Sequence, residues 1–344
     1  MKKSVWISMI VAAALVLAGI ACIAVGHALG GHTFLTQGEE SMGKTVQITH
    51  HEDRDFDRIR IDVLSADVEL IPSEDGRCRI VTKDHEKVEY LVFVEGDTLT
   101  IRTEDSRHWY DHIGIFGGSK ASLTVYLPVK SYESLTMDVS TGDVTVGHDF
   151  SFSEAVTVSV TVGDVSLSAS VQGTTTLSAT TGDLCVEGSH KALTASVTTG
   201  CVTVGSGAVE TLSVKSGSGD VIIRDLTAEG AVCVETTTGD QSLLRVTCGQ
   251  LDLRAGTGDV TLTDTVAAGH LRTKSTTGDV TFTRFDAATL SVETNTGSVR
   301  GSLRTPKVFY ADTTSGSVDV PKSTEGGICE IKTTSGSIRI IVEE

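Results

Sequence analysis

A short motif recurs along this chain at a nearly constant spacing, and it constrains the fold more than any other feature. Residues 275–283 read STTGDVTFT, and close variants of this stretch precede and follow it. Eleven motif glycines can be aligned, at intervals of 18 to 21 residues: Gly142, Gly163, Gly182, Gly200, Gly219, Gly239, Gly258, Gly278, Gly297, Gly316 and Gly336. A fixed period of this size is the signature of a solenoid or a related array.

The residues around each motif glycine alternate between apolar and polar. In one repeat, Leu251 and Leu253 precede the glycine and Val260 and Leu262 follow it, with polar residues between them. Such alternation indicates a strand with one buried face. The alternation changes phase at Gly-Asp, so we expect a corner there, where glycine can adopt positive φ. A polar third side then follows, with one apolar residue pointing inward in each repeat: Leu226, Val266 or Phe285.

Stacking these repeats about 4.8 Å apart predicts an all-β fold, a parallel β-solenoid (β-helix) of about eleven rungs of 19–20 residues. A Gly-Asp loop also suits an antiparallel hairpin, so a meander or a propeller-like array is the alternative. We expect the solenoid over residues 136–344 and an N-terminal β cap over 45–135, where the repeat is weak. At the far end, the strand in 338–344 finishes in Glu343 and Glu344, acids that would discourage edge-to-edge pairing.

The N-terminus predicts a membrane anchor. Residues 5–26 are apolar apart from Ser8, and at about 1.5 Å per residue they match a hydrocarbon core of about 30 Å. Lys2 and Lys3 precede them, which favours a cytoplasmic tail (1–4), a transmembrane helix (5–26), a linker (27–44) and an extracytoplasmic remainder. The alternatives are a cleaved signal peptide, whose apolar region is usually about 7–15 residues, and a lipoprotein modified at Cys22.

Charge and cysteine content disfavour several kinds of partner and site. The chain has 45 acidic and 28 basic residues and a net charge of −17, which disfavours nucleic acid as a partner. Its seven cysteines include no CxxC pair, so no zinc knuckle or thioredoxin-type motif is present. In the stacked repeats, Cys185 and Cys201 would lie about 8 Å apart, beyond the reach of a disulfide. We therefore expect free thiols.

An acidic residue follows most of the motif glycines, and these residues form the main candidate site. Stacked about 5 Å apart, neighbouring carboxylates would repel each other by about 1 kcal/mol, and Ca²⁺ between them would relieve this. The best calcium candidates are Asp220, Asp240, Asp259 and Asp279. In the alternative interpretation each Asp accepts a backbone N–H in its turn, a role that the Ser residues of the last three repeats can also fill. We expect no other cofactor.

Two histidine pairs are weaker candidates for a metal site. His108 and His112 have i, i+4 spacing within residues 108–112, and His50 and His51 precede Glu52 and Asp53. Solvated loop or linker residues are the alternative in both places. No nucleophile elbow, P-loop or dinucleotide fingerprint occurs. A carbohydrate-active β-helix enzyme is disfavoured, because repeats of nearly constant length leave no long loops to wall a cleft around a paired acid and base.

Several segments resemble a bacterial family. They are the apolar N-terminal segment, SADVEL at Ser65 to Leu70, LTVYLP at Leu123 to Pro128, and the serial T/S-G-D/S-V strands. Over residues 55–344 the chain is similar to membrane-anchored β-strand-repeat envelope proteins of unknown function, known as putative adhesins. The resemblance implies a surface or sensing role, since some members are encoded near envelope-stress regulators. We therefore expect a non-enzymatic surface module that binds a cell-wall polymer or a protein, with an envelope-stress sensor or regulatory scaffold as the alternative.

Overall fold

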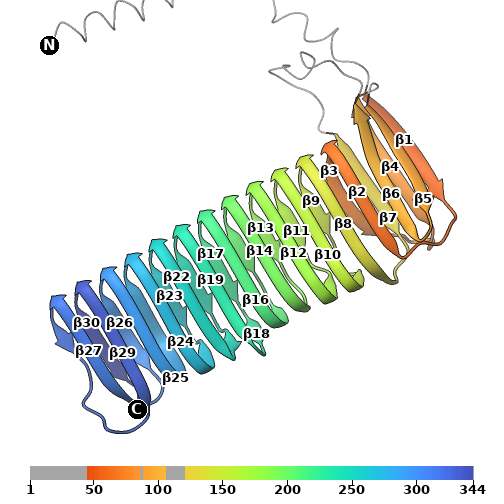
Figure 1. Cartoon of the computed structure of the whole chain (residues 1–344). Coiled ribbons are helices and arrows are strands. Elements are labelled where there is room, and N and C mark those ends of the chain that lie inside the picture. Colours follow the sequence, from red (N-terminus) through yellow and green to blue (C-terminus); the bar gives the residue numbers. More distant parts are fainter. Residues whose placement is uncertain (1–44, 86–87, 106–120, 344) are drawn as a thin grey trace, which may run out of the picture.

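The computed structural model describes residues 45–85, 88–105 and 121–343, and every regular element within them is a β-strand. The strands form a straight rod of stacked coils with a small group of strands across its N-terminal end (Figure 1). The predicted anchor at 5–26 and the linker at 27–44 lie outside the described residues. Within the described part, no helix is long and apolar enough to cross a membrane.

Each coil contributes strands to two sheets, with a glycine corner between them. Sheet A contains β1 (Thr45–Glu52), β3 (Asp67–Pro72), β4 (Cys78–His85), β7 (Ser122–Leu127), β9 (Val144–Val146), β11 (Val165–Leu167), β13 (Leu184–Val186), β15 (Val202–Val204), β17 (Val221–Arg224), β20 (Gln241–Leu244), β23 (Val260–Thr263), β26 (Val299–Leu303), β28 (Val318–Asp319) and β30 (Ile338–Val342). Sheet B contains β2 (Arg58–Ser65), β5 (Val88–Glu95), β6 (Thr98–Asp105), β8 (Ser131–Thr141), β10 (Ser151–Val162), β12 (Ser170–Thr181), β14 (His190–Thr199), β16 (Gly207–Ser218), β18 (Leu226–Ala228), β19 (Ala231–Thr238), β21 (Thr247–Cys248), β22 (Gln250–Thr257), β24 (Val266–Thr277), β27 (Lys307–Ser315) and β29 (Gly327–Ser335). The long strand β25 (Val280–Thr296) pairs in sheet A through its first residues and in sheet B through the rest.

The pairing between coils is parallel, which confirms the solenoid and rules out the meander. In sheet B, β10 pairs with β8 and β12, so that Val158 lies between Met137 and Leu177. In sheet A, β11 pairs with β9 and β13 in the same manner. Like residues therefore lie over like along the rod, as the constant repeat length predicts.

The interior consists of the predicted apolar columns. Leu251, Leu253, Val260 and Leu262 are at most 1% exposed. On the third side, Leu226 and Phe285 are buried as predicted. The prediction for Val266 is wrong: this residue is half-buried, and the inward position in its coil belongs to the fully buried Thr265. The hydroxyl of Thr265 is satisfied by the carbonyl of Thr263, so a polar side chain is tolerated there.

The N-terminal cap contains both coil strands and antiparallel strands. The coil formed by β2 and β3 lies between β6–β7 on one side and β8–β9 on the other. Strand β5 then pairs antiparallel with β6, β4 pairs antiparallel with β7, and β1 with β4. These antiparallel strands cover the N-terminal edges of both sheets (Figure 1). The first coil, β2–β3, is therefore paired with other strands on both sides.

The C-terminal end departs from the sequence-based prediction. Strands β29 and β30 do not end the rod: they insert between β25–β26 and β27–β28. The outermost coil is therefore β27–β28, and the predicted protection of the edge by Glu343 at the end of β30 is wrong. Phe309 in β27 is only partly buried, because no coil within the described residues covers its outer side.

Candidate functional site

The corners of the rod form one straight edge. All eleven motif glycines have φ between +137° and +156°, a range that favours glycine. A Cβ at any of them would also lie within 1.9–2.2 Å of the carbonyl oxygen of the residue stacked beneath it. Glycine is thus required at the corner by conformation and by space. Because the corner glycines stack on one another, the residues that directly follow them also lie next to one another in neighbouring coils.

The predicted acidic column lies along this edge and forms a hydrogen-bonded ladder. Oδ1 of Asp220 accepts the N–H of Asp240 at 2.8 Å, Asp240 accepts that of Asp259, and Asp259 that of Asp279. Asp279 in turn accepts the N–H of Ser298. The four calcium candidates are thus brought together in adjacent coils, and one oxygen of each is used by the backbone of the next coil. Calcium binding by the second oxygens stays a prediction.

The other predicted metal ligands are not gathered into a site. His50, His51 and Glu52 lie on β1, and the Glu52 carboxylate pairs with Arg54 at 3.0 Å. That hydrogen bond lowers the pKa of Glu52. His108 and His112 lie outside the described residues. Within the described residues, no three or more His, Cys, Asp or Glu side chains are arranged to hold a metal ion.

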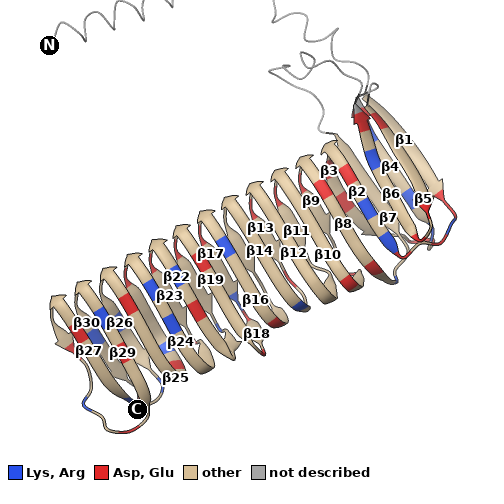
Figure 2. Cartoon of the chain, viewed as in Figure 1, with Lys and Arg blue, Asp and Glu red and all other residues tan. Residues whose placement is uncertain are grey.

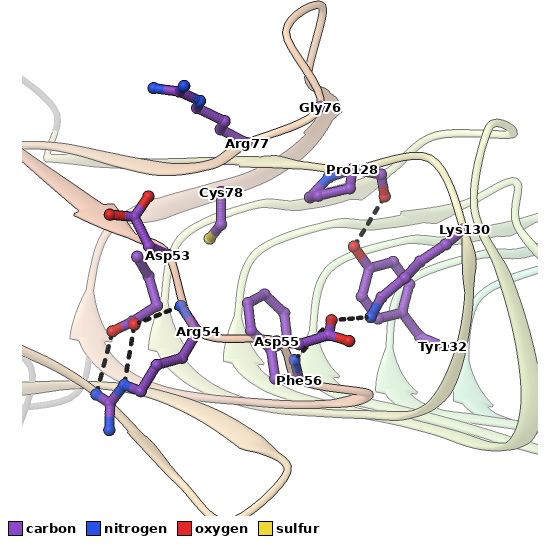
Figure 3. Close-up of a pocket in the computed structure, with 11 residues that line it drawn as sticks. Asp53, Arg54, Asp55, Phe56, Gly76, Arg77, Cys78, Pro128, Lys130 and Tyr132 are labelled. Carbon is purple, nitrogen blue, oxygen red and sulfur yellow. Dashed lines mark hydrogen bonds and ion pairs between the residues drawn. The ribbon is translucent and has the colours of Figure 1, made fainter.

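A cavity of about 280 Å³ lies where the cap meets the first coils (Figure 3). Its apolar wall is formed by Phe56 and Tyr132, whose rings stack at 6.1 Å between centroids. Lys130 lies over both rings and donates to Asp55 at 2.8 Å and to Asp57 at 2.9 Å. The sequence pattern does not reveal this cavity, because its lining comes from three separate segments of the chain, within residues 52–56, 76–78 and 128–132.

Four of the charged groups of this cavity form two ion pairs, Arg54 with Glu52 and Lys130 with Asp55. The hydrogen bond from Lys130 lowers the pKa of Asp55. Burial opposes the charge on Lys130, but its hydrogen bonds to Asp55 and Asp57 outweigh this effect and raise the pKa of the ammonium group. The guanidinium of Arg54 donates to the Val94 carbonyl at 2.7 Å, which ties β5 to this region. The contacts therefore make the cavity a junction that fixes the cap to the rod.

The cysteine thiols in the described residues are free, and the most deeply buried of them are not poised for nucleophilic chemistry. Cys78, which lines the cavity, is 4% exposed, and burial raises the pKa of its thiol to about 12. Cys329 is fully buried in the predicted interior column, and burial raises the pKa of its thiol to about 12 as well. Since the thiolate is the nucleophile, thiols with such pKa values are inert at neutral pH.

The outer surface of sheet B is the broadest regular surface of the rod. Its strands run for up to 12 residues in β10, β12 and β16, whereas their sheet A counterparts have three or four. On β10, β12 and β14 the outward residues six, four and two positions before the corner glycine are all Ser or Thr, and they are exposed or half-buried. We call these nine residues the hydroxyl face: Thr157, Ser159, Thr161, Thr176, Ser178, Thr180, Thr194, Ser196 and Thr198.

Toward the C-terminal end the same surface becomes charged. Figure 2 shows few charged residues on β10, β12 and β14 and many on the strands from β19 onward. In the register of the sheet, one outward column continues from Ser196 as follows: Lys215, Glu235, Arg254, Lys274, Glu293, Lys332 and Asp312. We call this column the charged ladder. The charged ladder can be recognised in the sequence, because every member lies four residues before a corner glycine.

Comparison with known proteins identifies a family. The model of the Toastrack DUF4097 family matches residues 56–246 and 198–344. No curated protein matches the chain. Two similar crystal structures are those of a putative adhesin from Parabacteroides distasonis (12% identity, TM-score 0.38, 87% of this chain and 98% of that chain) and of a putative adhesin from Parabacteroides merdae (12%, 0.36, 87% and 97%). A putative lipid binding protein from P. distasonis is similar at 13% identity and a TM-score of 0.38, over 87% of this chain and 98% of that chain.

Proposed function

This chain belongs to the Toastrack DUF4097 family, and we propose that it is a non-enzymatic, membrane-anchored protein of the bacterial cell envelope. In this proposal the apolar segment 5–26 anchors the chain in the membrane, and the rod extends on the extracytoplasmic side. The rod binds a cell-wall polymer or a protein partner in the manner of an adhesin. Nucleic acid is not a partner, because a net charge of −17 repels it.

The observation that carries the proposal is the outer surface of sheet B. The hydroxyl face presents nine Ser and Thr side chains in three parallel strands, at a spacing of about 4.8 Å between strands. Regular hydroxyl groups on a rigid sheet can donate to and accept from a repeating polymer at several places at once. A rod of this kind offers many weak contacts rather than one deep pocket, which suits adhesion.

A non-enzymatic role is supported by the state of the reactive groups. In the described residues, the cavity at the cap holds ion pairs and a thiol whose pKa is about 12. Hydrolysis of a glycan would need a paired acid and base with separated pKa values. The carboxylates along the corner edge are instead engaged by backbone N–H groups.

The test is binding of the purified full-length chain to isolated envelope material. We expect the chain to sediment with that material and to release no sugars from it. A Ser178→Glu variant places a charge in the hydroxyl face and should weaken binding by about tenfold, since a desolvated charge costs more than one hydrogen bond. Thr203→Glu is the matched control, because Thr203 points outward from β15 in sheet A.

Two results would contradict the proposal. One is the absence of binding to any envelope fraction, together with measurable sugar release, which would favour an enzyme. The other is an equal effect of the two variants, which would mean that sheet B is not the binding surface.

A further inference from the structure

The charged ladder contains one break in its alternation of charge. Along the sheet its members run positive, negative, positive, positive, negative, positive, negative. The break is at Arg254 and Lys274, which lie directly opposite each other on β22 and β24. Like charges in register on neighbouring strands destabilise a sheet. The placement of two cations at this point therefore carries a cost that the fold itself does not need.

The neighbouring acids do not neutralise both cations. Glu235 is in register with Arg254, but its carboxylate pairs with Lys215 at 3.5 Å. Glu293 pairs with Lys274 at 2.9 Å. Arg254 is exposed, and within the described residues no carboxylate lies within 4 Å of its guanidinium. This leaves a planar group of five donors at the surface of sheet B without an anionic partner.

A depression of about 390 Å³ lies beside these two cations. Its lining comes from four successive coils and includes Arg254, Gly256, Lys274, Thr276 and Asn295. Gly256 interrupts the column of Ser and Thr residues two positions before the corner. A Cβ there would lie 2.4 Å from the carbonyl oxygen of Thr237, so no side chain fills this part of the surface.

We infer that this depression binds a single anionic group, a carboxylate or a phosphate, carried by an otherwise neutral envelope glycan. Neighbouring strands are about 4.8 Å apart, so the side chains of Arg254 and Lys274 can reach the same group. Thr276 and Asn295 offer hydrogen bonds to adjacent sugar hydroxyls. Glu235 and Glu293, which also line the depression, repel further negative charge, so a densely charged polymer is disfavoured. This inference rests on the proposed function and names its ligand class.

The experiment compares three polymers that share one backbone: neutral dextran, lightly substituted carboxymethyl dextran and lightly substituted dextran phosphate. Affinity of the full-length chain is measured by surface plasmon resonance. We expect at least one anionic dextran to bind about tenfold more tightly than neutral dextran, since a charge-assisted bond contributes about that factor. Binding to the carboxymethyl polymer alone identifies a carboxylate, and binding to the phosphate polymer alone identifies a phosphate.

Variants then locate the site. Arg254→Gln and Lys274→Gln should each lose about tenfold in affinity for the anionic dextran. Their thermal midpoints should not fall below that of the wild type, because both side chains are exposed and each substitution relieves the repulsion between the two cations. Arg224→Gln is the control: Arg224 is an exposed residue of β17 in sheet A, and its loss should leave binding unchanged.

Unchanged binding by both ladder variants would overturn the inference, as would equal binding of neutral and anionic dextrans or no binding of any dextran. In each of these cases the wild-type chain could still sediment with envelope material, and the proposed function would then stand. Loss of that sedimentation is the separate result that removes the function.

Discussion

At the scale of single residues, the corner decides most of the fold. Each repeat turns through a glycine at positive φ, and in most repeats the carboxylate or hydroxyl after it accepts an N–H from the neighbouring coil, whereas Cys201 follows Gly200. The residue three positions before the glycine completes the corner where it carries a hydroxyl: Ser216 donates to the Gly219 carbonyl at 3.0 Å, and Thr333 to that of Gly297 at 2.9 Å. These hydroxyls are therefore satisfied inside the rod, whereas the buried hydroxyl of Ser275, three positions before Gly278, has no hydrogen-bond partner within the described residues.

We expect Gly239→Ala to cost about 3 kcal/mol or more in the free energy of unfolding, because the new Cβ would lie 2.2 Å from the Gly219 carbonyl oxygen and φ is +137°. Gly76→Ala is the control: its φ is also positive, at +69°, but nothing lies within 4 Å of the added Cβ. It should cost only about 1 kcal/mol. Denaturant melts of both variants measure the difference, and equal losses would contradict the role of stacking.

The two interpretations of the acidic column are separated at Asp240. Its Oδ1 accepts the Asp259 N–H at 2.8 Å, so Asp240→Asn, which keeps an oxygen acceptor, should unfold close to the wild type. Asp240→Ala loses the acceptor and should be about 1 kcal/mol less stable. If each Asp only accepts a backbone N–H, the thermal midpoint should be the same with calcium and with chelator. A calcium-dependent rise that is absent in Asp240→Asn would establish the cation column instead.

A buried histidine gives the rod a pH-dependent stability. His190 is 4% exposed, and burial lowers its pKa below the ordinary value of 6.5, although the Glu187 carbonyl opposes this shift. The unfolded chain therefore binds a proton more readily than the folded chain, and stability falls as pH drops below about 6.5. His190→Val, which matches Val171 and Val209 in the same column, should remove this part of the pH dependence. Melts from pH 5 to 8 check this, and an unchanged slope would contradict it. Exposed His148→Gln is the control.

At the scale of elements, some coils have a second kind of corner, which follows the sheet A strand. Four successive coils turn after their sheet A strand through Asp225, Arg245, Asp264 and Arg284, all with φ between +51° and +55°. These residues pair along the rod: Arg245 donates to Asp225 at 2.5 Å, and Arg284 to Asp264. Left-handed conformations are unusual for residues with side chains. This second corner carries no glycine, so the sequence pattern does not reveal it.

The insertion of β29–β30 into the stack predicts an unusual order of amide protection. Strand β29 is paired on both sides, with β25 and β27, whereas β27 is paired on one side only within the described residues. Hydrogen exchange should therefore be slower in Ile331 and its neighbours on β29 than in β27. Faster exchange in β29 than in β27 would indicate that the coils stack in the order of the chain.

At the scale of the whole molecule, the rod is a one-dimensional array, and each coil contacts only its neighbours. The apolar columns run from the cap to the last coils and are interrupted only at a few buried polar residues such as His190 and Thr265 in the described part of the chain. The surface is less uniform than the interior, because the hydroxyl face and the charged ladder lie on different strands of sheet B (Figure 2). The rod can therefore present two chemistries to one long partner.

A one-dimensional array should tolerate the loss of one complete coil. Deleting residues 240–258 joins Gly239 to Asp259 and removes one period, so the product should fold into a rod shorter by about 4.8 Å. Deleting only 249–258 shifts the remaining residues of that coil out of their columns and should prevent cooperative folding. Circular dichroism and small-angle scattering measure both products. Failure of the full-period deletion to fold would show coupling beyond nearest neighbours.

The sequence by itself determined the period, the corner glycines and most of the inward columns, and it favoured parallel stacking, because each of these depends on contacts between a residue and its equivalent one repeat away. Only the tertiary structure decided the order of the coils at the two ends, the cavity beneath the cap and the partners chosen along the charged ladder. The reason is the similarity of the repeats: every coil edge offers nearly the same columns, so the pattern fits any neighbour equally well. Which coil lies next to which, and which acid reaches which base, follows from the complete set of contacts in the folded chain.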